Sequence, residues 1–288
     1  MYLPTPITVT RPGTPADRQQ AGAALLQLTM LTALHLGSAG WLAGAVYAIG
    51  LQVLLAGAVR NARTCALGPA DLVTLGRALL VGGVTALVAD GLWTGHTAVG
   101  VLVPLAAVAL ALDAVDGRVA RRTGTVSELG ARFDMETDAF LIMVLSVQAA
   151  TVLGPWVLAI GALRYLFVAA GWVLPWLTGS LPARMSAKTI AAAQGIVLLA
   201  VSSTLLPPIA AAALTAAALA ALVWSFAQSI RLLARAEGPQ DTTARPAAAR
   251  SGTALPTVSK PSPTVLPATN RAWMPSAITA ALKYASPR

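Results

Sequence analysis

The most chemically suggestive stretch of this sequence runs from Asp113 to Asp138, where six of the eleven acidic residues of the chain gather. They are Asp113, Asp116, Glu128, Asp134, Glu136 and Asp138. Long apolar segments flank the stretch on both sides. Ionisable groups beside a hydrocarbon environment are costly, so they usually pair, bind an ion or mark a site. This stretch is therefore where we expect the chemistry of the protein.

The spacing of the aspartates suggests a site for divalent metal ions. Asp113 and Asp116 are three residues apart, so on a helix they would share a face. The same holds for Asp134 and Asp138, which are four residues apart. If the two pairs met on neighbouring helices, the carboxylates would repel one another unless a hard cation neutralised them. Mg²⁺ or Mn²⁺ suits such a site, whereas zinc prefers His or Cys, which the stretch lacks.

Small residues accompany the aspartates. Gly117 and Gly130 have no side chain and Ala120 has almost none, which would permit the close approach of a flat group. The alternative is that these residues only let neighbouring helices pack closely. The residues alone leave both interpretations open.

Eight residues of the stretch match the pattern D-x2-D-G-x2-A-R-x8-G-x3-D-x3-D. They are Asp113, Asp116, Gly117, Ala120, Arg121, Gly130, Asp134 and Asp138. This part of the chain resembles the signature of the CDP-alcohol phosphotransferases, also called phosphatidyltransferases. All eight fixed positions agree, which is far more specific than a lone D-x-x-D. The resemblance covers about residues 68–235.

The resemblance implies a role for each matched residue. Two divalent ions, Mg²⁺ or Mn²⁺, would be held by Asp113, Asp116, Asp134 and Asp138. Asp138 would also be the general base that takes a proton from the attacking hydroxyl. The cytidine of a CDP-linked donor would lie against Gly117, Ala120 and Gly130. Arg121 would bind the donor diphosphate, because a guanidinium fits its oxyanions.

The implied reaction moves a phosphatidyl-type group in phospholipid biosynthesis. A CDP-linked lipid donor, CDP-diacylglycerol, binds with its diphosphate at the metals, an alcohol acceptor attacks the phosphorus that bears the lipid, and CMP leaves. The resemblance also implies a homodimer. One alternative is a Mg-diphosphate-dependent membrane prenyltransferase, which would use two separate Asp-rich motifs where this chain has one. Another is a non-catalytic membrane scaffold that retains an old site.

Four basic residues are candidates for binding the acceptor: Arg77, Arg164, Arg184 and Lys188. Arg77 either snorkels to the interface or points into the same polar site as the aspartates. The family often carries an Asn where this chain has Asp71, although Thr74 and Arg77 fit its pattern.

Arg164 lies in the middle of an apolar segment, where an unpaired charge costs about 2.5 kcal/mol or more. It would either pair with an acid or contact a phosphate. With Arg184 and Lys188 it would form a basic pocket for an acceptor such as glycerol phosphate or inositol phosphate. Residues 188–194 loosely resemble the K-T-x-x-Q stretch of the phosphatidylglycerophosphate synthases, with two extra residues before Gln194. Glu128 and Glu136 lie outside the matched positions, and we expect them to be solvated or paired to arginines.

The elements that must position these residues are apolar helices. The chain is 56% hydrophobic and 11% charged, against roughly 25% charged for an average soluble domain. Eight segments approach the ~20 residues that span a bilayer: 20–37, 41–59, 74–92, 97–113, 134–153, 156–176, 188–206 and 209–230. We therefore expect an all-α polytopic membrane bundle, with a six-helix catalytic core and an N-terminal two-helix hairpin. One core helix should end at Asp113 and the next begin at Asp134, with the motif loop between them.

The basic residues predict the orientation of this bundle. With eight spans and an inside N-terminus, every Lys and Arg of the connecting loops falls inside, and the loops near 38, 94, 154 and 207 have none. This asymmetry is typical of membrane proteins. We expect an inner (plasma) membrane location in a bacterium, with the active site and both termini cytoplasmic. The basic residues behind the net charge of +9 would then face anionic membrane lipids. They do not form the aromatic-interleaved patch that would suggest nucleic-acid binding.

The sequence predicts four parts along the chain. Residues 1–18 and 236–288 are polar or rich in Pro, Ala, Ser and Thr, and we expect disordered tails there. Residues 19–60 form the extra transmembrane hairpin, and residues 68–235 form the catalytic domain. The single cysteine excludes an internal disulfide framework.

Overall fold

The computed structural model describes residues 15–62, 69–123, 128–174 and 185–236. Within these ranges the protein is all-helical and contains no strand, as the composition predicts. The elements are α1 (Pro15–Ala33), α2 (Ser38–Ala62), α3 (Pro69–Thr94), α4 (Val99–Thr123), α5 (Glu128–Leu153), the 3₁₀ helix η1 (Pro155–Val157), α6 (Leu158–Val173), α7 (Met185–Ser202) and α8 (Pro208–Ala236).

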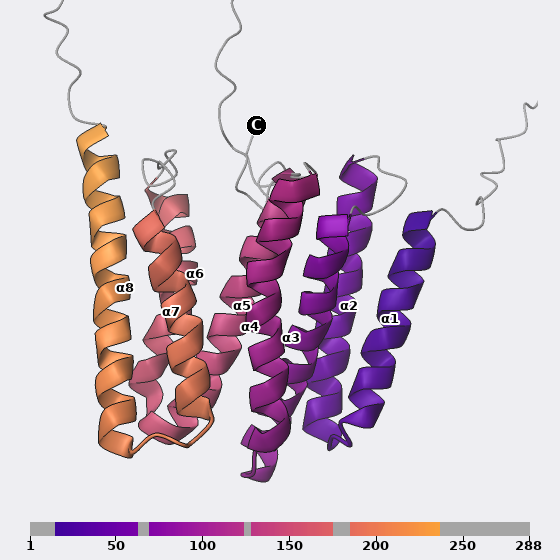
Figure 1. The fold of residues 1–288 in the computed structure, drawn as a ribbon, viewed down its shortest axis with the longest axis horizontal. Coiled ribbons are helices and arrows are strands. Elements are labelled where there is room, and N and C mark those ends of the chain that lie inside the picture. The colour runs from indigo at the N-terminus through magenta and orange to yellow at the C-terminus, as the bar shows by residue number, and fades with distance from the viewer. Residues whose placement is uncertain (1–14, 63–68, 124–127, 175–184, 237–288) are drawn as a thin grey trace, which may run out of the picture.

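Successive helices run in alternating directions, with α1 at one edge of the bundle and α8 at the other (Figure 1). The first residues of α1, α3, α5 and α7 and the last residues of α2, α4, α6 and α8 therefore lie at one end (Figure 1). Arg77, Asp113 and Asp134 lie toward this end of their helices.

Five helices in the described ranges are long and apolar enough to cross a membrane. They are the spans Ser38–Gly57, Asp71–Thr94, Phe133–Leu153, Pro155–Val173 and Pro208–Ala234. Two further apolar helices, Val99–Asp113 and Thr189–Ser202, are shorter. Helix α1 is not among the five, because Asp17, Arg18 and several glutamines make it more polar. The protein is thus a multi-pass membrane protein, and the count of eight spans stays a prediction.

Several helix boundaries differ from those expected. Helix α5 begins at Glu128, so the expectation that it begins at Asp134 was wrong. Helix α4 continues to Thr123, so the expectation that it ends at Asp113 and gives way to a loop was wrong. Residues 114–123 are mostly Ala, Val and Arg, which tolerate or favour a helix outside the apolar core. Helix α1 begins at Pro15, so the last residues of the expected N-terminal tail are helical. Proline suits a first helical position, and Asp17 favours the first turn.

The main apolar core lies between α3, α4, α5 and α7. Its fully buried members include Val81 and Val84 of α3, Leu102 of α4, Leu145 of α5 and Leu198 of α7. Helix α3 also packs against α1 and α2 on another side. It is therefore the central helix of the N-terminal half, and its position sets that of every residue it carries.

The N-terminal hairpin is attached to α3 at the end of the bundle far from Arg77. The Asp90 carboxylate of α3 accepts hydrogen bonds from the backbone N–H of Gly37, at 2.9 Å, and of Gly40, at 3.4 Å. Helix α2 begins at Ser38, so Asp90 caps its N-terminus from a neighbouring helix. A Cβ at Gly37 would lie 2.7 Å from Asp90 Oδ1. The contact therefore requires a residue without a side chain.

Candidate active site

Two helices that both pack against α3 carry the acidic residues of the site. Helix α4 carries Asp113, and α5 carries Asp134 and Asp138 four residues apart on one face. One carboxylate oxygen of each lies within 4.8 Å of the others. The three side chains are 40%, 34% and 40% exposed. A ligand can therefore reach each carboxylate from the open side.

Arg77 of α3 lies on the buried side of the carboxylate cluster. Its side chain has no exposed surface. The Nη1 atom donates to Asp113 Oδ1 at 2.5 Å and lies 3.2 Å from Asp138 Oδ1. The Nη2 atom donates to Asp134 Oδ1, and to the Asp134 backbone oxygen at 3.1 Å. One guanidinium thus contacts three carboxylates from two other helices, which its planar fork of donors suits well.

The charges of this cluster fit a divalent cation. Among the described side chains, three carboxylates surround one guanidinium. The carboxylate oxygens are hard ligands that lie close enough together to share an ion. His and Cys, the ligands that zinc prefers, are not part of the cluster. The residues present therefore suit Mg²⁺ or Mn²⁺.

A second ion pair lies on the neighbouring helices. Arg164 Nη2 of α6 donates to Glu136 Oε1 of α5 at 2.8 Å. The two side chains are 29% and 59% exposed, so the pair contributes little to stability. Among the described residues, no hydrogen-bond acceptor reaches the buried Nε of Arg164. Arg164 therefore keeps a donor that its pairing with Glu136 does not use.

Comparison with known protein families identifies the family of this chain. The model of the family described as CDP-alcohol phosphatidyltransferase matches residues 67–226, which is more than half of the chain. The chain belongs to the CDP-alcohol phosphatidyltransferase family. No curated protein and no solved structure gives a significant match. The protein is thus a membrane transferase of substituted phosphate groups that moves a phosphatidyl group from a CDP-alcohol to an alcohol acceptor. The family generally uses divalent metal.

The CDP-alcohol phosphatidyltransferase segment contains all the predicted site residues, and the structure describes some of their side chains. It brings together Asp113, Asp134 and Asp138, whose individual roles stay predictions. The side chains of the other matched residues lie outside the described part of the chain: Asp116, Gly117, Ala120, Arg121 and Gly130.

The four predicted acceptor residues of the phosphatidyltransferase are not all described. For Arg77, the geometry agrees with the position among the aspartates and not with snorkelling, because the side chain is fully buried. Arg164 pairs with an acid, Glu136, as one of its two alternatives predicts. Arg184 and the side chain of Lys188 lie outside the described residues. Whether these four residues bind the acceptor stays a prediction.

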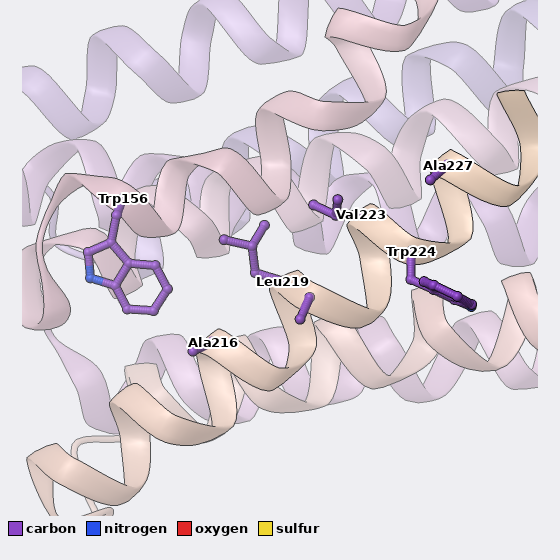
Figure 2. Close-up of a pocket in the computed structure, with 7 residues that line it drawn as sticks. Trp156, Ala216, Leu219, Val223, Trp224 and Ala227 are labelled. Carbon is purple, nitrogen blue, oxygen red and sulfur yellow. The ribbon is translucent and has the colours of Figure 1, made fainter.

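The phosphatidyltransferase also has an open apolar groove of about 500 Å³. Trp156 of η1 lies on one side of it, and α8 contributes Leu219, Val223 and Trp224 (Figure 2). None of the cluster residues lines the groove. Apolar walls bind neither phosphate nor metal, so the chemistry belongs to the carboxylate cluster.

Sequence reasoning missed two residues that hold this framework. By its sequence position Asp90 is only an isolated acid, and its glycine partners indicate only a turn. Tyr47 falls within an apolar span, although its hydroxyl reaches α3. The only sequence signal for either is a polar group inside an apolar helix, which has to find a partner.

Proposed function

We propose that the protein transfers a phosphatidyl group from CDP-diacylglycerol to an alcohol acceptor and releases CMP. The observation that carries this proposal is the meeting of Asp113, Asp134 and Asp138 around the buried Arg77, inside the segment that matches the family.

Two Mg²⁺ or Mn²⁺ ions would be held by Asp113, Asp116, Asp134 and Asp138. When bound, they would supply Lewis-acid stabilisation of the charge that develops on the phosphoryl oxygens and on the departing CMP. The closeness of three carboxylate oxygens, which lie within 4.8 Å of one another, supports this assignment.

Asp138 serves as the general base. Its Oδ1 lies 3.2 Å from Arg77 Nη1, which orients the carboxylate, and its side chain is 40% exposed and open to a ligand. The acceptor hydroxyl gives its proton to this carboxylate, and the acceptor oxygen forms a bond to the phosphorus that carries the lipid. The bond from that phosphorus to the CMP oxygen breaks, and CMP leaves with its electron pair. Arg77 keeps the carboxylates in place throughout.

The donor nucleotide is bound by the remaining residues of the signature. Gly117, Ala120 and Gly130 leave room for the flat cytidine, and Arg121 binds the diphosphate. Their positions in the family pattern support these roles.

The acceptor is an alcohol phosphate, such as glycerol phosphate or inositol phosphate. Arg164, Arg184 and Lys188 bind its phosphate. Support comes from the buried Arg164 Nε, which has no acceptor among the described residues although Nη2 is paired to Glu136. An anionic acceptor would provide the missing oxygen.

The active site faces the cytoplasm from a bacterial inner membrane, as do both termini. The distribution of positive charge supports this orientation. The connecting segments that contain Lys or Arg all join helices at the end nearest Arg77, and Lys and Arg are enriched on the cytoplasmic side of membrane proteins. The protein works as a homodimer, a proposal supported by the family resemblance alone.

A direct test uses the full chain in lipid nanodiscs with CDP-diacylglycerol, Mg²⁺ and a panel of acceptors. The panel contains glycerol phosphate, inositol phosphate, serine and phosphatidylglycerol, and both CMP and the product lipid are measured. We expect acceptor-dependent CMP release with one alcohol phosphate. A protein that releases no CMP with any acceptor contradicts the proposal and favours a scaffold. Turnover of an isoprenoid diphosphate instead favours a prenyltransferase.

A further inference from the structure

Tyr47 links the N-terminal hairpin to the helix that carries Arg77. Its hydroxyl, on α2, donates a hydrogen bond of 2.8 Å to the backbone oxygen of Ala78 on α3. Ala78 directly follows Arg77 in the chain. The hairpin lies outside residues 67–226, so this contact joins a segment beyond the family match to the centre of the site.

The Tyr47 side chain also contacts α5, the helix that carries Asp134 and Asp138. The rings of Tyr47 and Phe140 have centroids 5.4 Å apart and are tilted by 37°, a favourable aromatic arrangement. Phe140 lies on α5, two residues after Asp138. Tyr47 therefore contacts both α3 and α5 close to the residues that meet in the site.

Helix α3 is shaped to receive this tyrosine. Gly82 lies one turn beyond Ala78 and on the same face. A Cβ at Gly82 would lie 2.7 and 2.8 Å from two ring carbons of Tyr47. A side chain at this position would push the ring away from α3 and remove its hydrogen bond. The absence of a side chain is thus a condition of the contact.

An apolar cluster surrounds this junction. Its buried members are Ala23 of α1, Leu51 and Leu55 of α2, and Leu75, Ala78 and Leu79 of α3. Tyr47 and Phe133 pack against it. Phe133 directly precedes Asp134, and the three α3 residues lie on both sides of Arg77 in the sequence. The hairpin therefore packs behind the turns that carry the ion-paired residues.

We propose that Tyr47 is a positioning residue for the transferase reaction. By touching α3 and α5 together, it keeps Arg77 at the distance from Asp134 and Asp138 that the carboxylate cluster needs. A misplacement of about 1 Å can lower the rate of an enzyme about 100-fold, and catalytic constellations tolerate only about 0.5 Å. The N-terminal hairpin is then part of the catalytic unit, and not only an additional membrane anchor. The expected effect on CMP release rests on the proposed function.

The test compares three variants of the full chain in nanodiscs. Tyr47→Phe removes the hydrogen bond and keeps the ring, and Tyr47→Leu removes both. Thr32→Val is the matched control, because the Thr32 hydroxyl belongs to the same hairpin but donates only to Thr29 of its own helix, at 2.8 Å. Two quantities are measured: Mn²⁺ affinity, by the loss of the free-ion electron paramagnetic resonance signal, and kcat and KM for CMP release.

We expect Tyr47→Phe to weaken Mn²⁺ binding and to lower kcat about five-fold, the effect of one hydrogen bond, with the donor KM unchanged. Tyr47→Leu should lower both further, and Thr32→Val should match the parent. If Mn²⁺ affinity and kcat of both Tyr47 variants equal those of the parent, the inference is overturned. If Tyr47→Leu does not fold, Tyr47→Phe alone decides. If the parent binds Mn²⁺ but releases no CMP, the proposed function fails, and the Mn²⁺ titration still decides on Tyr47.

Discussion

Asp113 of α4 and Arg77 of α3 meet through a contact of 2.5 Å between Oδ1 and Nη1, and the arginine side chain has no exposed surface. A buried guanidinium is expensive to desolvate, so its carboxylate partners are needed for it to stay charged. The same guanidinium keeps the carboxylates from repelling one another. The predictions below follow from this mutual dependence.

Replacing Arg77 by Gln should damage both the fold and the activity. The change leaves three carboxylates facing one another without their shared partner, which should destabilise the protein by about 3–5 kcal/mol, as is typical when a buried pair is broken. CMP release should fall by at least about 100-fold. Thermal unfolding in nanodiscs and the CMP assay measure the two effects. Arg231→Gln, at an exposed position of α8, is the matched control and should behave like the parent.

Replacing Asp138 by Asn should stop the chemistry with little change of shape. The amide cannot accept the acceptor proton at neutral pH, so kcat should fall by about 10²–10⁴. Asp90→Asn is the control, because Asn keeps a side-chain oxygen for the backbone N–H groups of Gly37 and Gly40. The general-base assignment is wrong if the Asp138 variant releases CMP as fast as the parent does.

Removing divalent metal should abolish activity and leave the protein folded. Arg77 already pairs with the three described carboxylates, so the metal-free cluster keeps a partner. Mg²⁺ or Mn²⁺ should restore CMP release after chelation. An ion at a hundred times its dissociation constant should add about 2.7 kcal/mol to the stability of the native state. Circular dichroism, thermal unfolding and the CMP assay check these outcomes, and activity that survives thorough chelation would count against a metal site.

Replacing Arg164 by Ala should affect the acceptor and not the donor. Losing a charge-assisted hydrogen bond to phosphate should raise the KM for an alcohol phosphate about 10-fold or more. The KM for CDP-diacylglycerol should not change. Glu136→Gln is the companion variant, since it removes the negative charge that Arg164 Nη2 pairs with and should not raise the acceptor KM. Equal effects on both substrates would place Arg164 outside the acceptor site.

Replacing Asp90 by Ala should loosen the attachment of the N-terminal hairpin. The backbone N–H groups of Gly37 and Gly40 lose their acceptor, and a lost helix cap costs about 0.5–2 kcal/mol. Hydrogen exchange should increase at the start of α2 relative to the parent. Asp90→Asn should show a much smaller increase. Unchanged exchange in the Ala variant would mean that Asp90 does not cap α2.

Composition and local spacing by themselves determined much of this protein. The apolar composition predicts an all-helical membrane protein, because only helices satisfy the backbone groups of such long apolar segments within themselves. The distance of four residues between Asp134 and Asp138 predicts a shared face, because helical periodicity is local. The family pattern is equally local, since it lies within Asp113–Asp138.

Tertiary structure alone decided what completes the site. Arg77 is separated from Asp113 by 36 residues and from Asp134 by 57, and only the packing of α3 against α4 and α5 brings them into contact. The link from Tyr47 to Ala78 likewise depends on how α2 lies against α3. Contacts between helices depend on which faces pack and in what register, and these follow from many side chains acting together. Helix periodicity, in contrast, follows from the backbone of each segment by itself.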